Sequence, residues 1–168
     1  HFHKDPANPL AMTFWGRVHI EHAAAWFHYT KGSLYPRLIH VMKYSGRRDI
    51  GRTLGRLYAA ELKNTPLALA HLIVPVPLHP RKKRKRGYNQ SEWIGRGLSE
   101  GLDKPLVTAN LQRMVNTRSQ TKKSRLERWK NVENVFRVRE PATLQHKHLL
   151  LVDDVVTTGA TLESSAGA

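Results

Sequence analysis

Residues 149–161 read Leu-Leu-Leu-Val-Asp-Asp-Val-Val-Thr-Thr-Gly-Ala-Thr, an apolar run that leads into two carboxylates and a threonine-rich turn. The run Leu149–Val152 is short and does not alternate, which is typical of a strand covered on both faces in a parallel sheet. We therefore expect a central strand at this position. Asp153 and Asp154 then stand at its carboxyl end, where open α/β sheets bind their ligands.

The residue types that follow this strand suit a sugar phosphate. Two adjacent carboxylates can accept hydrogen bonds from vicinal sugar hydroxyls, and they can also help to hold a divalent cation. Residues 157–161 offer hydroxyl groups and closely spaced backbone N–H groups at the predicted start of a helix, a combination that attracts an anion. The alternative is an ordinary Asp-rich turn, but turn chemistry alone does not require two threonines before a glycine.

This pattern resembles the phosphoribosyl pyrophosphate fingerprint of type I phosphoribosyltransferases, which has an apolar strand, two acidic residues, two apolar residues and a Thr/Gly turn. The resemblance implies that Asp153 and Asp154 are the catalytic pair and contact the ribose hydroxyls. It also implies a site for the 5′-phosphate formed by Val156, Thr157, Thr158, Gly159, Ala160 and Thr161.

Composition limits the possible classes of protein. The 168 residues include 28 Lys and Arg against 13 Asp and Glu, a formal net charge of +15, so we expect a polyanionic partner such as pyrophosphate or nucleic acid. The absence of cysteine excludes disulfides and thiolate metal sites and suits a cytoplasmic protein. No apolar run approaches the roughly 20 residues of a membrane-spanning helix, so we expect no membrane insertion.

The order of the predicted elements favours an α/β fold, with a mostly parallel sheet flanked by helices. We divide the chain into an N-terminal arm with short, hood-like strands, residues 1–30, and a phosphoribosyltransferase-like domain, residues 31–168. Both ends look truncated, because a doubly wound sheet normally continues with a helix and a strand after the phosphate motif. The predicted strands cover residues 14–30, 72–78, 106–115, 135–138 and 149–152, and the predicted helices begin at Ser33, Asp49, Asn89 and Ser124.

A second candidate site follows the predicted strand at residues 72–78. Six contiguous cations come next, before a Gly turn and a predicted helix that Asn89 caps: Arg81, Lys82, Lys83, Arg84, Lys85 and Arg86. Arg side chains and backbone donors at a strand exit can neutralise a pyrophosphate leaving group. A charge run is also typical of a solvated surface or a nucleic-acid-binding arm, and the sequence leaves both interpretations open.

The motifs of residues 74–90, residues 117–131 and the final phosphate motif together resemble the ComF-type competence family. The resemblance covers roughly residues 34–166. It implies a pyrophosphate loop formed by Val76, Pro77, Leu78 and His79, and a mobile loop that includes Arg118, Gln120, Thr121 and Lys122. Members commonly carry an N-terminal Cys-rich zinc finger; these 168 residues contain no cysteine, and the sequence leaves open whether such a finger precedes His1.

The function expected from the resemblance is binding of phosphoribosyl pyrophosphate with Mg²⁺, with possible transfer of the phosphoribosyl group to a nitrogen acceptor. No protein residue is predicted to bind a metal directly, because the His pairs have no third ligand at a suitable spacing. The alternative function is an accessory protein of DNA uptake that binds single-stranded DNA through residues 81–86. A third is a sensor of phosphoribosyl pyrophosphate without turnover, and a homodimer is a further possible assembly.

Overall fold

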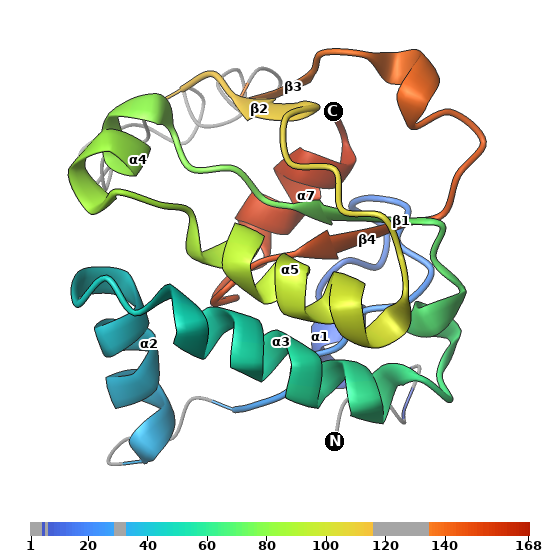
Figure 1. Cartoon of the computed structure of the whole chain (residues 1–168). Coiled ribbons are helices and arrows are strands. Elements are labelled where there is room, and N and C mark those ends of the chain that lie inside the picture. Colours follow the sequence, from blue (N-terminus) through green and yellow to red (C-terminus); the bar gives the residue numbers. More distant parts are fainter. Residues whose placement is uncertain (1–4, 6, 29–32, 116–134) are drawn as a thin grey trace.

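The computed structural model describes residues 5, 7–28, 33–115 and 135–168 (Figure 1). Two short 3₁₀ helices, η2 and η3, accompany the helices and strands. In chain order the elements are α1 (Pro9–Met12), α2 (Leu34–Tyr44), α3 (Arg48–Leu62), η2 (Pro66–Leu69), β1 (Leu72–Pro75), α4 (Pro80–Arg86), α5 (Gln90–Leu102), β2 (Leu111–Arg113), β3 (Phe136–Val138), η3 (Pro141–Thr143), β4 (Leu149–Val152) and α7 (Ala160–Ala166).

A parallel pair of strands lies at the centre of the fold. β1 pairs with β4, with Ile73 opposite Leu150, and on its other side Ile73 forms a bridge to Leu106. All four residues of β1 are buried, whereas Leu149 at the start of β4 is 37% exposed. The described strands therefore do not confirm the prediction that β4 is central. Within the described residues β1 has neighbours on both sides, while β4 pairs on one side only.

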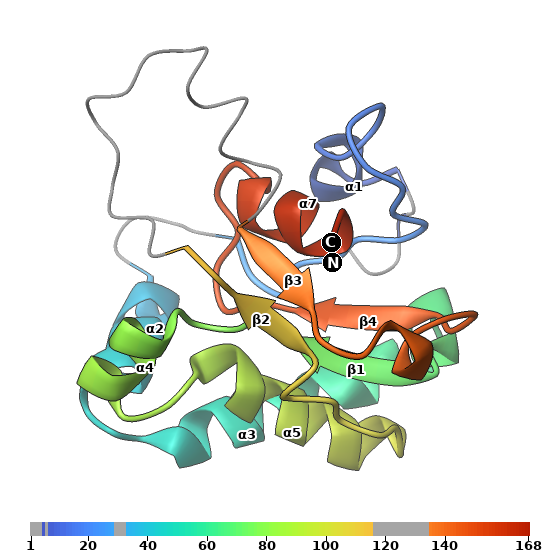
Figure 2. The ribbon, with the colours of Figure 1, turned by 90° about the horizontal axis from the view of Figure 1, so that it is seen from above.

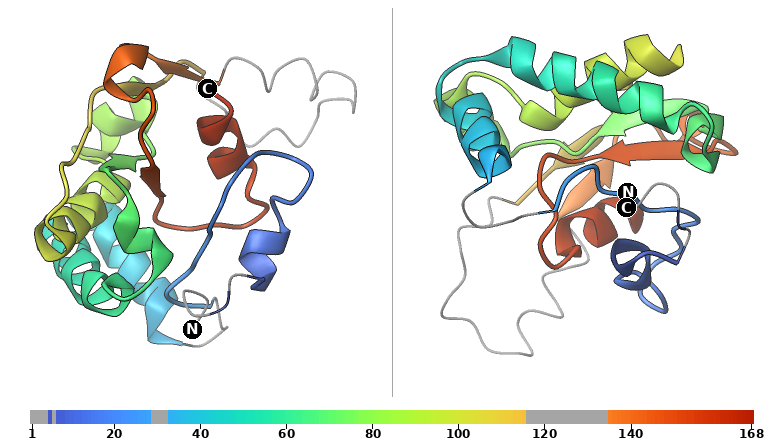
Figure 3. Two further views of the ribbon diagram at one scale, coloured as in Figure 1. Left: turned by 90° about the vertical axis from the view of Figure 1, so that its right-hand side faces the viewer. Right: turned by 90° about the horizontal axis from the view of Figure 1, so that it is seen from below.

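The two faces of this sheet are covered by different elements. Ile73 and Val152 pack against α3 and α5, through a cluster that includes Ala59 and Leu98. Val74, one residue along, belongs to the opposite cluster, because successive side chains of a strand point to opposite faces. There it packs with residues of β2, β3 and α7, and Figure 3 shows α7 and α3 on opposite sides of the sheet. The predicted α/β architecture is confirmed as a small parallel sheet with helices on both sides.

Helices α3 and α5 lie unusually close together, because glycines face glycines and backbone along their contact. A Cβ atom at Gly55 would collide with the backbone carbonyl oxygen of Ile94, and one at Gly97 would collide with that of Arg52. Larger side chains would force the helices apart by more than the core can accommodate. This contact fixes the position of the first turn of α5, which contributes to the candidate site.

The N-terminal segment differs from its prediction. Within the described residues 14–28 there is no strand; the chain forms turns and extended loop. Its aromatic residues pack sideways on helices, with Trp26 stacked on Tyr58 of α3 and Phe27 on Tyr35 of α2. Ring stacking, rather than alternation across a sheet, explains why these residues are apolar. The proposed division at residues 30/31 stays a prediction.

Other predicted elements are confirmed with changed bounds. The helices expected after Ser33 and around Asp49 are α2 and α3. The strand expected over residues 106–115 is confined to β2, which pairs antiparallel with β3 (Figure 2). The helix predicted after Ser124 lies outside the described residues. No helix in the described ranges is long and apolar enough to cross a membrane.

Candidate functional site

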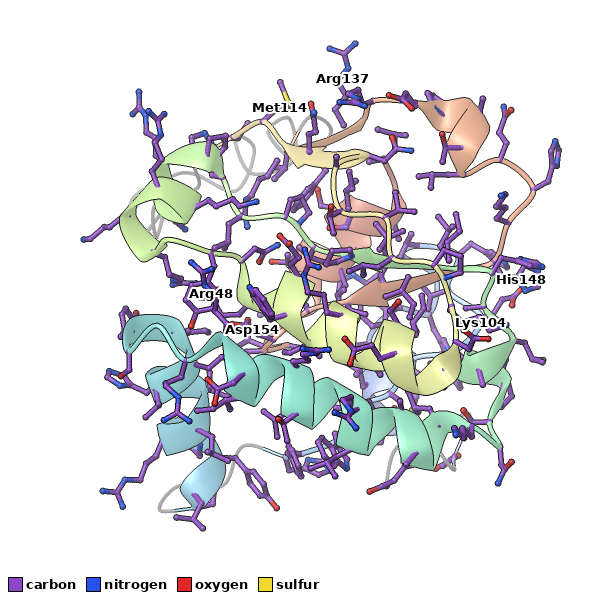
Figure 4. All side chains as sticks on the ribbon, viewed as in Figure 1. Arg48, Lys104, Met114, Arg137, His148 and Asp154 are labelled. Atoms are coloured by element: carbon purple, nitrogen blue, oxygen red, sulfur yellow. The ribbon has the colours of Figure 1, made fainter. Side chains whose placement is uncertain are left out.

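Strands β1 and β4 end at the same edge of the sheet, because they are parallel. The Val76 N–H donates to the Val152 carbonyl at 2.8 Å, so the segments that leave the two strands start side by side. Figure 4 shows Asp154 and Arg48 at this end of the sheet, and His148 at the opposite end, where β4 begins. The predicted pyrophosphate loop and the paired carboxylates are therefore neighbours.

Asp153 is half-buried and held from two directions. Its Oδ1 accepts from the hydroxyl of Ser91, in the first turn of α5, at 3.0 Å and from the backbone N–H of Asp154 at 2.8 Å. Burial raises the pKa of Asp153 to about 6, and the charge of Asp154 acts in the same direction. The two hydrogen bonds and the Lys43 charge oppose this rise in pKa. The carboxylate is thus fixed in orientation but weakly compensated in charge.

Asp154 pairs with a cation from another part of the chain. Its Oδ2 lies 3.0 Å from Nζ of Lys43, in the last turn of α2, and the two side chains are only 13% and 23% exposed. An ion pair with this little exposure is less screened by solvent than a surface pair. Each of the adjacent carboxylates is therefore attached to a different helix, Asp153 to α5 and Asp154 to α2.

A cavity of about 1230 Å³ opens beside these carboxylates, and Asp153 and Asp154 line it. Its other walls are largely apolar and come from the N-terminal segment, α3, β4 and α7. Val156 and Thr157 of the predicted phosphate site also line it. Polar groups grouped in a mainly apolar concavity are typical of a small-molecule site.

The threonine turn connects β4 to α7. Gly159 has a left-handed backbone (φ 77°) and stands at the N-cap of α7, and the ring of Phe14 packs against it. Thr157 and Thr158 are exposed, and their hydroxyls make no hydrogen bond to the described part of the chain. Arg17 of the N-terminal segment forms an ion pair with Glu163 of α7. The N-terminal segment thus supports the turn while the hydroxyls stay accessible.

The predicted pyrophosphate loop leads into a helix instead of a further turn. Pro80 occupies the first turn of α4, and Gly87 ends it in a left-handed conformation (φ 85°), so the six cations 81–86 are helical. His79 caps this helix, because its Nδ1 accepts from the Arg81 N–H at 3.2 Å. Desolvation, followed by the charges of nearby cations including Arg113, lowers the pKa of His79. This helix is not among those predicted from the sequence.

The predicted cap of α5 is also different from expectation. Asn89 occupies the N-cap position without a side-chain capping bond. Its Nδ2 donates instead to the Val76 carbonyl at 2.9 Å, which satisfies a backbone acceptor of a buried residue. Asn89 therefore ties the start of α5 to the loop after β1.

Sequence reasoning missed three residues of the site: Lys43, Ser91 and Arg113. Arg113, on β2, is half-buried; desolvation lowers its pKa, and the charge of Asp153 opposes that shift. Each of the three lies more than 35 positions from the Asp pair, so no local motif connects them to it. Only Ser91 could have been suspected from the sequence, because it lies in the first turn of the helix predicted to begin at Asn89, close to where the strands end.

The cations of α4 differ in their partners. Lys83 Nζ lies 3.6 Å from Glu92, and Arg86 donates to Gln90 at 2.6 Å while its guanidinium stands over the Tyr44 ring. Within the described residues, three of the six make no ion pair and are exposed: Arg81, Arg84 and Lys85. α4 thus presents a concentrated positive surface beside an exposed aromatic ring.

The predicted mobile loop, with Arg118, Gln120, Thr121 and Lys122, lies outside the described residues. Across the parts of the chain that are described, no three His, Asp or Glu side chains are grouped as a metal site.

Comparisons with known proteins agree with the sequence motifs. The chain is 38% identical over 133 residues to the DNA utilization protein YhgH of Escherichia coli K12, and 34% identical over 130 residues to competence protein F of Haemophilus influenzae. It is 25% identical over 138 residues to competence protein ComFC of Bacillus subtilis.

These alignments cover 77%, 74% and 82% of the chain, and 58%, 57% and 54% of the respective relatives. The chain therefore spans somewhat more than half the length of the relatives that it matches. No family model and no solved structure matches it. By its similarity to these relatives, the chain belongs to the ComF-type competence family.

Proposed function

We propose that the chain binds phosphoribosyl pyrophosphate with Mg²⁺ where β1 and β4 end, and that it transfers the phosphoribosyl group to a nitrogen acceptor. The observation that carries this proposal is the pair Asp153–Asp154, which stands at the carboxyl end of a parallel strand and lines a cavity. Such an edge is where sheets of this kind bind ligands.

The polar groups at the ends of β1 and β4 match the parts of this ligand. The two carboxylates can accept hydrogen bonds from the vicinal ribose hydroxyls, and the accessible hydroxyls of Thr157 and Thr158 suit the 5′-phosphate. His79 and Arg113 stand on the side of β1, where a pyrophosphate group would extend. This division follows the resemblance to phosphoribosyltransferases and is supported by the neighbouring strand ends.

The residues also suit Mg²⁺. This ion usually binds through one or two carboxylates, several waters and the phosphates of a substrate, without a complete set of protein ligands. Asp153 and Asp154, at the end of β4 and in the wall of the cavity, would supply the carboxylates. When bound, Mg²⁺ neutralises charge on the pyrophosphate.

Transfer needs no nucleophile from the protein. The bond between the anomeric carbon and the pyrophosphate oxygen breaks, pyrophosphate leaves with the electron pair, and the acceptor nitrogen forms the new bond and releases a proton to solvent. Because positive charge develops on the sugar ring, the nearby carboxylates stabilise it, while cations such as Arg113 stabilise the leaving group. The protein also contributes by holding the two reactants in line.

Calorimetry with phosphoribosyl pyrophosphate and Mg²⁺ tests the binding step. We expect Asp153→Asn/Asp154→Asn to weaken binding at least about tenfold, or about 1.4 kcal/mol, because amides accept the sugar hydroxyls and the metal less well. The matched control is Arg84→Gln/Lys85→Gln, which removes two charges from the exposed face of α4. Unchanged affinity in a folded Asp double variant would refute the assigned contacts, and release of pyrophosphate with a panel of nitrogen acceptors tests turnover.

A second candidate function is binding of single-stranded DNA during DNA uptake. Two observations favour it. Relatives are named for DNA utilization and competence, and α4 presents exposed cations, among them Arg81, Arg84 and Lys85, beside the exposed ring of Tyr44. Backbone charge neutralisation combined with aromatic stacking is the usual basis of single-strand binding.

Salt dependence of oligonucleotide binding tests this function. Each phosphate contact contributes about 0.7 to the slope of log affinity against log salt for a single strand. We expect Arg81→Gln/Arg84→Gln/Lys85→Gln to lower the slope by about 2. Weak binding with little salt dependence in the wild type would exclude this role for α4.

A further inference from the structure

Lys43 is a third charged residue at the carboxylate pair, and the sequence motif does not include it. It comes from α2, more than 100 positions before Asp154, and its Nζ lies 3.0 Å from Asp154 Oδ2. The charge of Asp153 also acts on the pKa of Arg113, from β2, so this cation is electrostatically coupled to Asp153. The carboxylates are therefore paired with a cation from α2 and coupled to a second cation from β2.

The position of Lys43 is set by its neighbours in α2. Met42 is fully buried, and its carbonyl accepts the hydroxyl of Tyr88 from the segment between α4 and α5. This contact anchors the last turn of α2 beside the strand ends independently of the ion pair. The Lys43 side chain, by contrast, is long and flexible and keeps 23% of its surface exposed.

We propose that Lys43 is the resident counter-ion of Asp154 and exchanges partners when the ligand binds. A divalent cation and the sugar hydroxyls take over the carboxylate, and the lysine ammonium moves to a phosphate group of the ligand. The inference rests on the proposed function and assigns to that site a further binding residue, with a phosphorylated sugar as its ligand class.

The exchange follows from the charges. In the ligand-free chain Lys43 offsets the repulsion between two adjacent, largely desolvated carboxylates. A divalent cation competes with it for the same oxygens, since both are attracted by the same negative charge. The released ammonium then lies within a side chain's reach of the ligand phosphates, to which it can donate up to three hydrogen bonds.

This proposal predicts effects of opposite sign on a cation and on an anion. In Lys43→Met we expect Mn²⁺ alone to bind about threefold more tightly or better, because its competitor is gone. We expect phosphoribosyl pyrophosphate with Mg²⁺ to bind at least about fivefold more weakly, because a phosphate contact is lost. Lys43→Gln, which keeps a hydrogen-bond donor but not the charge, should show the same split and serves if the Met variant does not fold.

The affinities for Mn²⁺ and for phosphoribosyl pyrophosphate with Mg²⁺ are both measured on the full chain by titration calorimetry. Electron paramagnetic resonance follows Mn²⁺ binding independently. The control is Lys63→Met. Lys63 follows the C-terminal end of α3, away from the site, so removing its charge should change neither affinity. A purely structural role would weaken both ligands together, and that result, or no change in either, overturns the exchange alone. If the wild type binds neither ligand, the proposed function fails, and the exchange fails with it.

Discussion

The two strand exits at this edge of the sheet use charge in opposite ways. After β4, the charged side chains are few and largely buried, and each is attached to a helix, Asp153 through Ser91 and Asp154 through Lys43. After β1, the cations of α4 are many and exposed, and three of them have no ion pair within the described residues. Fixed, desolvated charges give orientation and specificity, whereas exposed charges attract any polyanion and are screened by salt.

The largest expected effect is a separation of the two exits by ligand. We expect the Arg81→Gln/Arg84→Gln/Lys85→Gln variant to lose about tenfold to a hundredfold in oligonucleotide affinity at low salt, because three phosphate contacts are removed. The same variant should bind phosphoribosyl pyrophosphate within about twofold of wild type, because its fixed site is intact. Fluorescence anisotropy and calorimetry on one preparation measure both.

The reciprocal variant completes this separation. Asp153→Asn/Asp154→Asn should keep its oligonucleotide affinity, or gain slightly as negative charge is removed. If each variant lost both ligands in parallel, the segments after β1 and β4 would form one continuous polyanion site, and their charges would not act separately.

A second effect concerns stability at the β4 exit. Because the pKa of Asp153 is raised to about 6 from the ordinary value of 3.8, the folded chain binds this proton more tightly than the unfolded chain does. The contribution of Asp153 to stability is therefore fully present below about pH 4 and is lost as the pH rises to about 6 and above. Asparagine does not ionise, so Asp153→Asn should avoid this loss, which we expect to be about 1–3 kcal/mol of unfolding free energy in the wild type.

Urea unfolding at about pH 4.5 and about pH 7.5 measures this difference between wild type and variant. Asp103→Asn, at an exposed position after α5, is the control and should follow the wild type at both values. A wild-type chain whose stability relative to Asp153→Asn does not fall over this range would show that the carboxylate is better solvated than its surroundings indicate.

How much the sequence predicted differs between the same two exits. After β4, the order of strand, carboxylates and Thr/Gly turn is local, so the position of each residue could be predicted from spacing alone. After β1, the sequence analysis did not predict helix α4, because residues 81–86 stand out mainly by their charge. Two local signals for this helix were present, Pro80 at its start and Gly87 at its end.

What spacing could not provide was the set of partners from elsewhere in the chain. Lys43 pairs with Asp154, and Arg113 is electrostatically coupled to Asp153, only because the fold brings α2 and β2 beside the strand ends. Tertiary contact also decided the use of Asn89, whose side chain satisfies the Val76 carbonyl in place of the predicted cap. The predicted strands over residues 14–30 are a further example. Their aromatic residues stack on helices, and stacking of this kind leaves no periodic pattern in the sequence that would distinguish it from a strand.

A third prediction concerns the backbone of the threonine turn. Gly159 has φ 77°, and a Cβ there would approach the Phe14 ring at 2.9 Å, so Gly159→Ala should destabilise the chain by about 1–2 kcal/mol. Gly167→Ala is a matched control, because Gly167 has φ −80° and an added Cβ meets only an ordinary contact at 3.5 Å. Thermal unfolding of the two variants measures the difference, and equal stability would mean that the turn relaxes without cost.

The smallest expected effect isolates the hydrogen bond that orients Asp153. Ser91→Ala removes the 3.0 Å bond to Oδ1, at a cost of about 1 kcal/mol in unfolding free energy. Since that bond favours the charged form, its loss should raise the pKa of Asp153 further, which ¹³C NMR of the carboxyl carbon can follow. Ser165→Ala, which loses a bond only to the Thr161 carbonyl of its own helix, should leave this pKa unchanged. An unshifted pKa in Ser91→Ala would mean that the Asp154 N–H and Lys43, rather than Ser91, stabilise the charged form of Asp153. The carboxylates after β4 would then depend on α2 and not on α5.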